Sequence, residues 1–281
     1  MSSKLSKNGI YPFKAEQNEC NFRKQLFSST LIQQMLTSAD YHSTERKFGT
    51  AQLQEVGKTW VLSRFAIEIV NLPQRHAQFN IETFIESVAT MFTNRCFIAA
   101  YKDGEVFASG KSVWAMLDVE SRKPQNILDF ENGALNQYIF DEKKVSIEKP
   151  SRVKVDDNLV LFRTIETYYN DIDFNGHVNS CRYIEHVLDL FSMDWHSKYI
   201  VKRLDVVFVS EAHCGDTLNF YCSAPQYIGN VNTKDERSKK ELSAAELSPK
   251  EVEYVVKICK ISKDDAQEKE CVRVKVLWRT L

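Results

Sequence analysis

The sequence predicts an α+β fold in which two halves of the chain each combine one helix with a run of long strands. Apolar, β-branched segments of strand type occur in both halves, and one segment of helical periodicity accompanies them in each half. The two halves also resemble each other in this composition of elements. Hydrophobic residues make up 43% of the 281 residues, enough for a sizeable core. We therefore expect a sheet to wrap around one helix in each half.

The first half begins with a helix and continues with four strands. In "SSTLIQQMLTSADYHS", apolar residues such as Leu31 and Met35 recur at helical spacing, and Ser28 or Ser29 is the expected N-cap. The Asp-Gly pair in "KDGE" predicts a tight hairpin between the third and fourth strands. The four strands are expected at residues 59–70, 79–89, 93–102 and 105–119.

The second half has a strand, a helix and four further strands. The first strand is expected at residues 159–169, and Asn179 is a suitable N-cap for the helix that follows. One face of that helix is expected to carry Tyr183, Ile184, Val187, Leu188 and Phe191. The later strands are expected at residues 199–210, 216–224, 252–261 and 271–278.

These segments suggest two domains joined by a linker. We expect an N-terminal domain over residues 1–130 and a C-terminal domain over residues 159–281. Residues 131–158 have few strand signals and many charges, so they form the expected linker. Residues 232–250 are polar and charged, which predicts a mobile loop between two strands.

Composition excludes several classes of protein. The net charge of −1 gives no electrostatic reason to expect a nucleic-acid partner, and no apolar run reaches the ~18–20 residues of a membrane span. The N-terminus lacks the apolar region of a secretory signal, so a soluble cytoplasmic protein is expected. The seven cysteines are scattered without a Cys-x-x-Cys pair, and no Gly-rich phosphate loop occurs. We therefore expect neither a metal nor a cofactor.

The segment "NDIDFNGHVNSCRYIEHVLDLF" contains the strongest candidate site. Asp173, Asn175 and His177 occupy every second position, so an extended backbone would place a carboxylate, an amide and an imidazole on one face. A helix start near Gly176 and His177 would supply backbone N–H groups to stabilise an oxyanion. Taken singly, the His could be structural, the Asn could cap a turn and the Asp could form an Asx-turn.

A second candidate lies in "FVSEAHCGD", at the end of an expected strand. Glu211 follows apolar residues there, where a carboxylate loses solvation, as a general base or acid requires. The alternative is an ordinary surface charge followed by a simple turn. Because the first cluster offers complementary groups, we favour the catalytic interpretation.

With these residues in view, the chain resembles the acyl-acyl-carrier-protein thioesterases of plants and bacteria. That family has the pattern D-x-N-x-H-V-N-N/S-x-K/R-Y-I, and the match covers Asp173, Asn175, His177, Val178, Asn179, Arg182, Tyr183 and Ile184. The segments "WVLSRFAIEIVNLP" and "DGEVFASGKSVWAMLDVESRKP" resemble the family's first half, and the likeness spans about residues 22–225.

The resemblance implies a tandem, or double, hotdog fold, with two antiparallel sheets that each wrap a long helix. It also implies hydrolysis of fatty acyl-acyl carrier protein, an acyl-binding N-terminal domain, and a catalytic C-terminal domain with Asp173, Asn175, His177 and Glu211. The plant enzymes carry Glu-Cys where this chain has Glu211-Ala212, and the nearest thiol, Cys214, is displaced by two positions. Water is therefore the expected nucleophile.

Two alternatives stay open at this point: an acyl-coenzyme A thioesterase of the same fold, and a non-hydrolytic acyl-binding or hydratase-like hotdog protein. The expected partner is acyl carrier protein, bound by a monomer or homodimer. Its acidic surface would require cations, and the candidates are Arg182, Lys198, Lys202 and Arg203. The candidate walls of an acyl tunnel are Met35, Trp60, Phe92 and Trp114.

Overall fold

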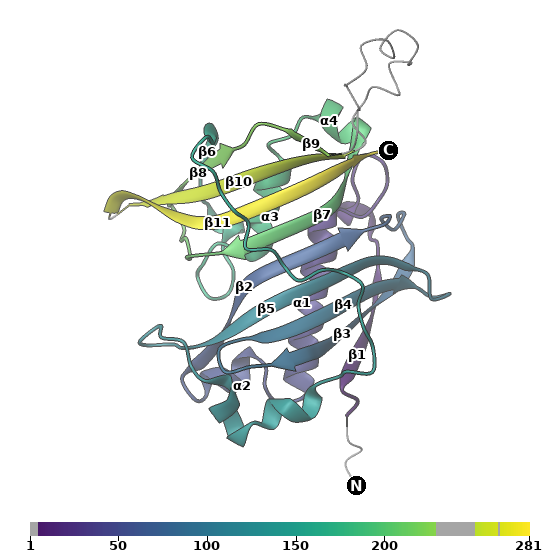
Figure 1. The fold of residues 1–281 in the computed structure, drawn as a ribbon, viewed down its shortest axis with the longest axis vertical. Helices are drawn as coiled ribbons and strands as arrows, with labels where there is room; N and C mark the ends of the chain where they lie inside the picture. The colour runs from purple at the N-terminus through teal and green to yellow at the C-terminus, as the bar shows by residue number, and fades with distance from the viewer. Residues whose placement is uncertain (1–4, 229–250, 264) are drawn as a thin grey trace. The chain divides into compact units, whose positions relative to one another are not determined.

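A computed structural model of the chain describes residues 5–228, 251–263 and 265–281. The loop expected at residues 232–250 lies outside these described residues. The chain divides into two compact units (Figure 1). Unit 1 comprises Met1–Arg152 and Asp205–Phe208, and unit 2 comprises Val153–Leu204 and Val209–Leu281. Across the described ranges, no helix combines the length and apolar character needed to cross a membrane.

Unit 1 is built on five strands in the order β1-β3-β4-β5-β2, with every neighbouring pair antiparallel. The four strands predicted for this half are confirmed, as is the hairpin, where Gly104 has a φ of 92°. The sequence did not suggest β1, which contains Pro12 and pairs with a single neighbour, as proline in a strand usually requires. The bounds are β1 (Asn8–Lys14), β2 (Lys58–Ile69), β3 (Gln78–Val88), β4 (Thr93–Tyr101) and β5 (Val106–Asp118).

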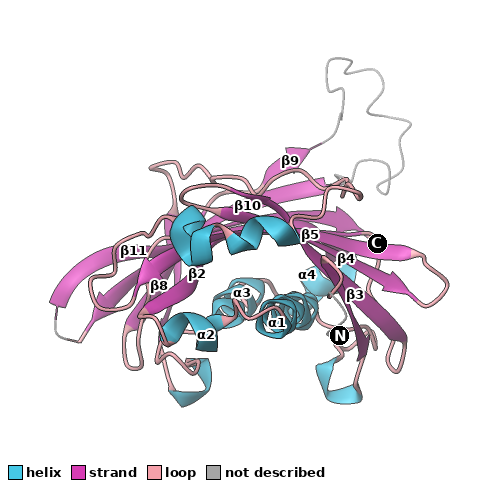
Figure 2. Cartoon of the chain, turned by 90° about the horizontal axis from the view of Figure 1, so that it is seen from below, coloured by secondary structure: helices cyan, strands magenta, loops and turns pink. Residues whose placement is uncertain are grey.

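The long helix α1 (Ser28–Glu45) lies on the inner face of the curved strands of unit 1 (Figure 2). Its apolar face, including the fully buried Leu31 and Met35, packs toward the sheet. A Cβ on Gly110 of β5 would lie 3.1 Å from the Met35 sulfur, so glycine permits this close approach. The predicted Ser28 or Ser29 cap is wrong, because Phe27 is the N-cap and both serines are buried in the first turn.

The segment after β5 packs on unit 1. Its short 3-10 turns (η2, Ile127–Asn132; η3, Ala134–Tyr138) bury Ile127, Phe130 and Leu135 against a cluster that includes α2 (Thr50–Gln54). Farther along, Val145 and Ile147 pack on Phe84, Cys96 and Ile98. These buried residues explain why the segment groups with unit 1 as far as residue 152. The domain and linker boundaries expected at residues 130 and 158 stay a prediction.

Unit 2 contains a strand order of β7-β11-β10-β8-β6, with the short β9 beside β10. The pairs β6–β8, β8–β10 and β10–β11 are antiparallel. All five strands predicted for this half are confirmed, which establishes the mixed α and β class with antiparallel pairing. The bounds are β6 (Val160–Glu166), β7 (Tyr199–Phe208), β8 (Thr217–Cys222), β9 (Gln226–Ile228), β10 (Glu251–Ser262) and β11 (Asp265–Thr280).

The helix of unit 2 is shorter than predicted. Helix α3 (Ser180–Leu188) begins after Asn179, whose side-chain oxygen accepts from the Cys181 N–H at 2.8 Å, so the predicted N-cap is confirmed. The helix ends before Phe191, which instead packs on Trp195 and Trp278. Ser192 caps a second helix, α4 (Met193–Lys198). The apolar periodicity of the sequence extends past the end of α3, because Phe191 belongs to a separate aromatic cluster with Trp195 and Trp278.

Candidate active site

The motif that precedes α3 is a tight turn. Ile172 and Val178 form an isolated antiparallel bridge, and the chain reverses between them. Within the turn, the Asp173 N–H donates to the His177 carbonyl at 2.8 Å. The predicted extended alternation is therefore wrong, because the turn closes before a strand can form. Gly176 has a φ of 82°, a conformation that residues with a Cβ rarely adopt.

The Asp173 carboxylate holds this turn from the inside. Its Oδ1 atom accepts from the backbone N–H of Asn175 at 2.8 Å and from that of His177 at 3.2 Å. The Gly176 N–H donates to the Asp173 carbonyl at 3.0 Å. These N–H groups are thus already bonded, and α3 begins only at Ser180. The expected oxyanion site at a helix start near Gly176 and His177 is therefore wrong.

The structure brings His177 and Glu211 together. The His177 Nε2 atom lies 3.3 Å from the Glu211 Oε2 atom, and both side chains are partly exposed, at 24% and 34%. The turn and the loop after β7 are joined by the Val178 N–H, which donates to the Ala212 carbonyl at 2.8 Å. The Lys260 ammonium also donates to the Glu211 backbone carbonyl, which fixes this loop from β10. Two segments far apart in sequence thus position one imidazole–carboxylate pair.

Asn175, His213 and Cys214 lie in the same two segments as this pair. Asn175 is exposed on the turn, where its side chain is accessible to a ligand. The His213 ring lies edge-on to the His177 ring, with 5.1 Å between their centroids. Cys214 is exposed and lies with Gly215 in the turn between β7 and β8. The thiol is therefore outside any strand or helix that could aim it at a substrate.

The buried carboxylate of Asp171, which the sequence analysis missed, links the turn to helix α3. Asp171 accepts from the Tyr168 N–H at 2.9 Å, and its Oδ1 lies 3.1 Å from His186 Nε2 and 3.3 Å from Arg182 Nε. Its carbonyl accepts from the Asn179 N–H at 2.8 Å. Burial alone would raise the pKa of Asp171, but the Tyr168 N–H, His186 and Arg182 together lower it. The i, i+4 spacing of Arg182 and His186 on one helix face was the available signal.

The cations expected to dock a carrier lie in unit 2, and three of them contact carboxylates. Arg182 pairs with Asp171 and with Glu185, so it belongs to the network behind the turn. Lys198 lies 2.8 Å from Asp194 with 62% of its side chain exposed, and Lys202 pairs with Glu251. Arg203 follows on β7. Lys198 therefore has the most exposed side chain of these three cations.

Two of the expected tunnel residues line a pocket in unit 1. Trp60 and Trp114 contribute to its wall, and its volume is about 70 Å³. Met35 is fully buried on the sheet-facing side of α1, and Phe92 is 39% exposed in the turn between β3 and β4. Neither Met35 nor Phe92 lines this pocket.

Comparison with known proteins assigns this chain to a family. Residues 11–131 match the model of the acyl-ACP thioesterase N-terminal domain, and residues 155–255 match that of the C-terminal domain. This chain belongs to the acyl-ACP thioesterase family. Both matched segments include the candidate residues of their half, with Trp60 and Trp114 in the first and the His177–Glu211 pair in the second.

Curated relatives of this acyl-ACP thioesterase family member come from plants. Oleoyl-acyl carrier protein thioesterase 1, chloroplastic, of Arabidopsis thaliana is 24% identical over 68% of this chain and 55% of its own length. A chloroplastic palmitoyl-acyl carrier protein thioesterase of Gossypium hirsutum is 22% identical over 50% of this chain and 35% of its own. The chain thus spans about a third to a half of the curated relatives it matches.

Solved structures agree over nearly the whole chain. An acyl-ACP thioesterase from Bacteroides thetaiotaomicron is 35% identical, covers 97% of this chain and 98% of its own, and has a TM-score of 0.80. The 12:0-ACP thioesterase from Umbellularia californica has a TM-score of 0.78 at 15% identity, covering 99% of this chain and 100% of its own. The second likeness shows the shared fold.

Proposed function

We propose that this protein hydrolyses the thioester of fatty acyl-acyl carrier protein and releases a free fatty acid. The observation that carries the proposal is the 3.3 Å contact between His177 Nε2 and Glu211 Oε2. It is an acid–base pair in the half of the chain where the family's C-terminal domain matches. Relatives at 24% and 35% identity bear the names of acyl-ACP thioesterases.

In the proposed mechanism, the His177–Glu211 pair acts as one proton-transfer unit. It takes a proton from a water molecule that attacks the thioester carbonyl, and it returns a proton to the departing thiolate. The Asn175 amide, exposed on the same turn as His177, positions the water or the carbonyl. Asp173 fixes the turn that carries Asn175 and His177. Thiolates are good leaving groups, so positioning and charge stabilisation contribute most of the rate enhancement.

Water is the proposed nucleophile because Ala212 follows Glu211 in this chain. The exposed Cys214 lies in a turn two residues farther on. A thiol nucleophile needs a base within hydrogen-bond reach, and among the described residues Cys214 has no hydrogen bond to a base. This arrangement supports direct hydrolysis without an acyl-enzyme intermediate.

We propose that the two units form a tandem hotdog fold with distinct roles. The contacts of α1 with β1 and β3 in unit 1, and of α3 with β11 in unit 2, support a helix held against a sheet in each. Unit 1 would bind the acyl chain, with Trp60 and Trp114 as wall residues, and unit 2 would carry the chemistry. We also propose a place in fatty acid biosynthesis and a cytoplasmic location; the two plant relatives above are named chloroplastic.

The proposed partner is acyl carrier protein, which binds to cations of unit 2. The chain itself acts as a monomer or homodimer in this proposal. Reversing charge at Lys198 (Lys198→Glu) is expected to raise KM for the carrier substrate a few-fold at low salt, and the effect should fade as salt screens it. The exposed Lys144 of unit 1 offers a matched control, Lys144→Glu, with little expected change. An equal KM for Lys198→Glu and the parent at low salt would remove Lys198 from the docking surface.

Release of free thiol from acyl carriers tests the proposed activity. We expect rapid release from fatty acyl-acyl carrier protein and slower release from the corresponding acyl-coenzyme A. Faster hydrolysis of the coenzyme A thioester would favour the first alternative. Water addition to an enoyl thioester without thiol release would favour the hydratase-like alternative.

A further inference from the structure

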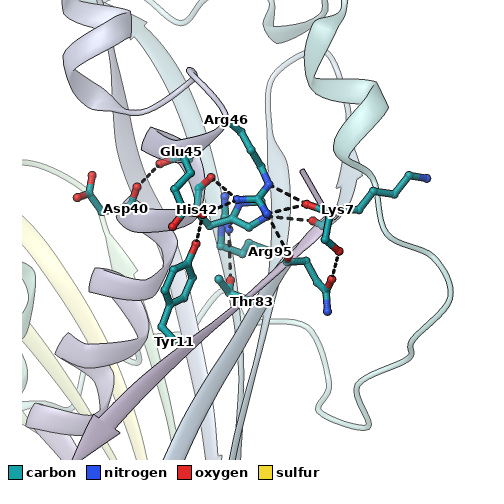
Figure 3. Close-up of polar contacts among 11 residues, drawn as sticks. Lys7, Tyr11, Asp40, His42, Glu45, Arg46, Thr83 and Arg95 are labelled. Carbon is teal, nitrogen blue, oxygen red and sulfur yellow. Dashed lines mark hydrogen bonds and ion pairs between the residues drawn. The ribbon is translucent and has the colours of Figure 1, made fainter. Parts of the chain in front are cut away.

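A buried polar cluster in unit 1, remote in sequence from the proposed catalytic residues, has no role in the mechanism above. It lies where the C-terminal end of α1 meets β3 and β4, around His42 and Arg95 (Figure 3). His42 is fully buried, and Arg95 is 5% exposed. Placing two such groups in a core is costly unless every polar atom has a partner.

The hydrogen bonds of His42 define its protonation. The Nε2–H group donates to the Lys7 carbonyl at 2.9 Å, so the Nδ1 atom carries the lone pair that accepts from Arg95 Nη1 at 3.1 Å. Burial, together with the nearby charges of Arg95 and Arg46, lowers the pKa of His42 to about 2. The ring is therefore a neutral acceptor that holds the Arg95 guanidinium in one orientation.

Arg95 keeps donors that this cluster does not use. Its Nη1 atom donates to His42 and, at 3.2 Å, to the Thr83 hydroxyl. Within the described part of the chain, its Nε and Nη2 atoms have no hydrogen-bond acceptor, and no carboxylate pairs with it. Of the carboxylates in this region, Glu45 contacts Arg46 and Tyr11 at 3.0 and 2.7 Å, and Asp40 lines the same pocket but forms no ion pair with Arg95 among the described residues. Burial lowers the pKa of Arg95 to about 10, so the group is still a cation at neutral pH.

The same guanidinium lines the pocket of unit 1. The remaining wall is largely apolar, with Phe48, Trp60, Ile85 and Trp114, and Thr93 adds a hydroxyl. Asp40 also lines the pocket, and burial raises the pKa of its carboxyl group. The pocket volume is about 70 Å³, whereas one water needs roughly 10–15 Å³ by the same measure. The space therefore holds several waters or one small organic ligand with an aliphatic part.

We propose that this pocket binds a short aliphatic carboxylate, with the carboxylate on Arg95 and the hydrocarbon against Trp60 and Trp114. A carboxylate supplies both the counter-charge and the acceptor geometry that a guanidinium fork prefers. The apolar walls select a ligand with a tail over a bare ion. An aliphatic carboxylate is also the product class of the proposed hydrolysis, but the binding does not depend on that activity.

The test is a titration with butyrate, followed by ¹⁹F NMR of the protein with fluorine-labelled tryptophan. The tryptophan resonances that shift show where butyrate binds. Trp60 and Trp114 line the pocket, whereas Trp195 and Trp278 pack against each other in unit 2. Saturable shifts of the first two resonances with the last two unchanged are expected. Butyramide should bind about tenfold or more weakly, since it lacks the charge. Acetate, which lacks two methylenes of butyrate, should bind about fifteenfold more weakly, since each buried methylene contributes roughly a factor of four.

The variants Arg95→Gln and Arg95→Lys test the anchor. Loss of the butyrate preference over butyramide is expected for Arg95→Gln, and partial retention for Arg95→Lys. Equal binding of butyrate and butyramide to the parent protein, or shifts confined to Trp195 and Trp278, would overturn the proposal. The comparison of the two ligands uses the parent chain, so it decides the matter even when a variant fails to fold.

Discussion

The two units each contain a histidine beside a charged group, but the surroundings differ. His42 of unit 1 is fully buried, contacts the Arg95 cation and is held neutral. His177 of unit 2 is 24% exposed by side chain and contacts the Glu211 carboxylate. A neutral ring locked between a carbonyl and a cation can orient its neighbour but cannot exchange protons with solvent. An imidazole beside a carboxylate at the surface can do so, which is why we assign the chemistry to unit 2.

The largest stability effect should come from the buried histidine. Replacing His42 with Ala leaves Arg95 Nη1 and the Lys7 carbonyl with fewer partners and opens a cavity, at a cost of about 3 kcal/mol in the free energy of unfolding. Urea denaturation measures this. His213→Ala is the matched control in unit 2, where the side chain is 57% exposed, and should change the free energy by about 0.5 kcal/mol or less. Equal losses in both variants would erase the contrast between the units.

The pH dependence of stability should also reveal the buried, neutral state of His42, with a somewhat smaller change in the free energy of unfolding. The pKa of His42 is about 2 in the folded chain, compared with about 6.5 when unfolded. As pH falls below about 6.5, the unfolded state therefore binds more protons than the folded state, and the free energy of unfolding decreases. Between pH 7 and pH 5 the loss from this group is about 2 kcal/mol. His42→Gln, which cannot titrate, should lack this component; an unchanged slope in that variant would contradict the buried, neutral state.

The turn that presents His177 should respond more weakly. Asp173→Ala removes the acceptor of two backbone N–H groups and should cost about 1 kcal/mol in stability, with a lower kcat because the turn loosens. Asp173→Asn keeps an oxygen at the same position and should retain most of both. Were Asn as damaging as Ala, the negative charge of Asp173 would matter more than the turn it closes.

The strands of both units were predictable because their apolar, β-branched runs are long and end at clear turn signals. The bend at Asp173–Gly176 was missed because alternation was weighed above turn chemistry, although Asn-Gly and an Asx residue favour a turn. His177 and Glu211 were each selected from their own segments, and only the resemblance to the family placed them in one site, since nothing local places two residues 34 positions apart in contact. The His42–Arg95 contact joins residues 53 positions apart, and no periodicity indicates it.

The central claim is that His177 and Glu211 act as one unit with water as the nucleophile, and a double-mutant cycle tests it most directly. Thiol release from fatty acyl-acyl carrier protein would be measured for His177→Ala, Glu211→Ala and the double variant, with Cys214→Ala as the control. We predict that each single change lowers kcat by about 10²–10⁴, that the double variant is little worse than the poorer single one, and that Cys214→Ala stays within a few-fold of the parent. Losses that multiply in the double variant, or a covalent acyl adduct on Cys214 with loss of activity in Cys214→Ala, would contradict the account.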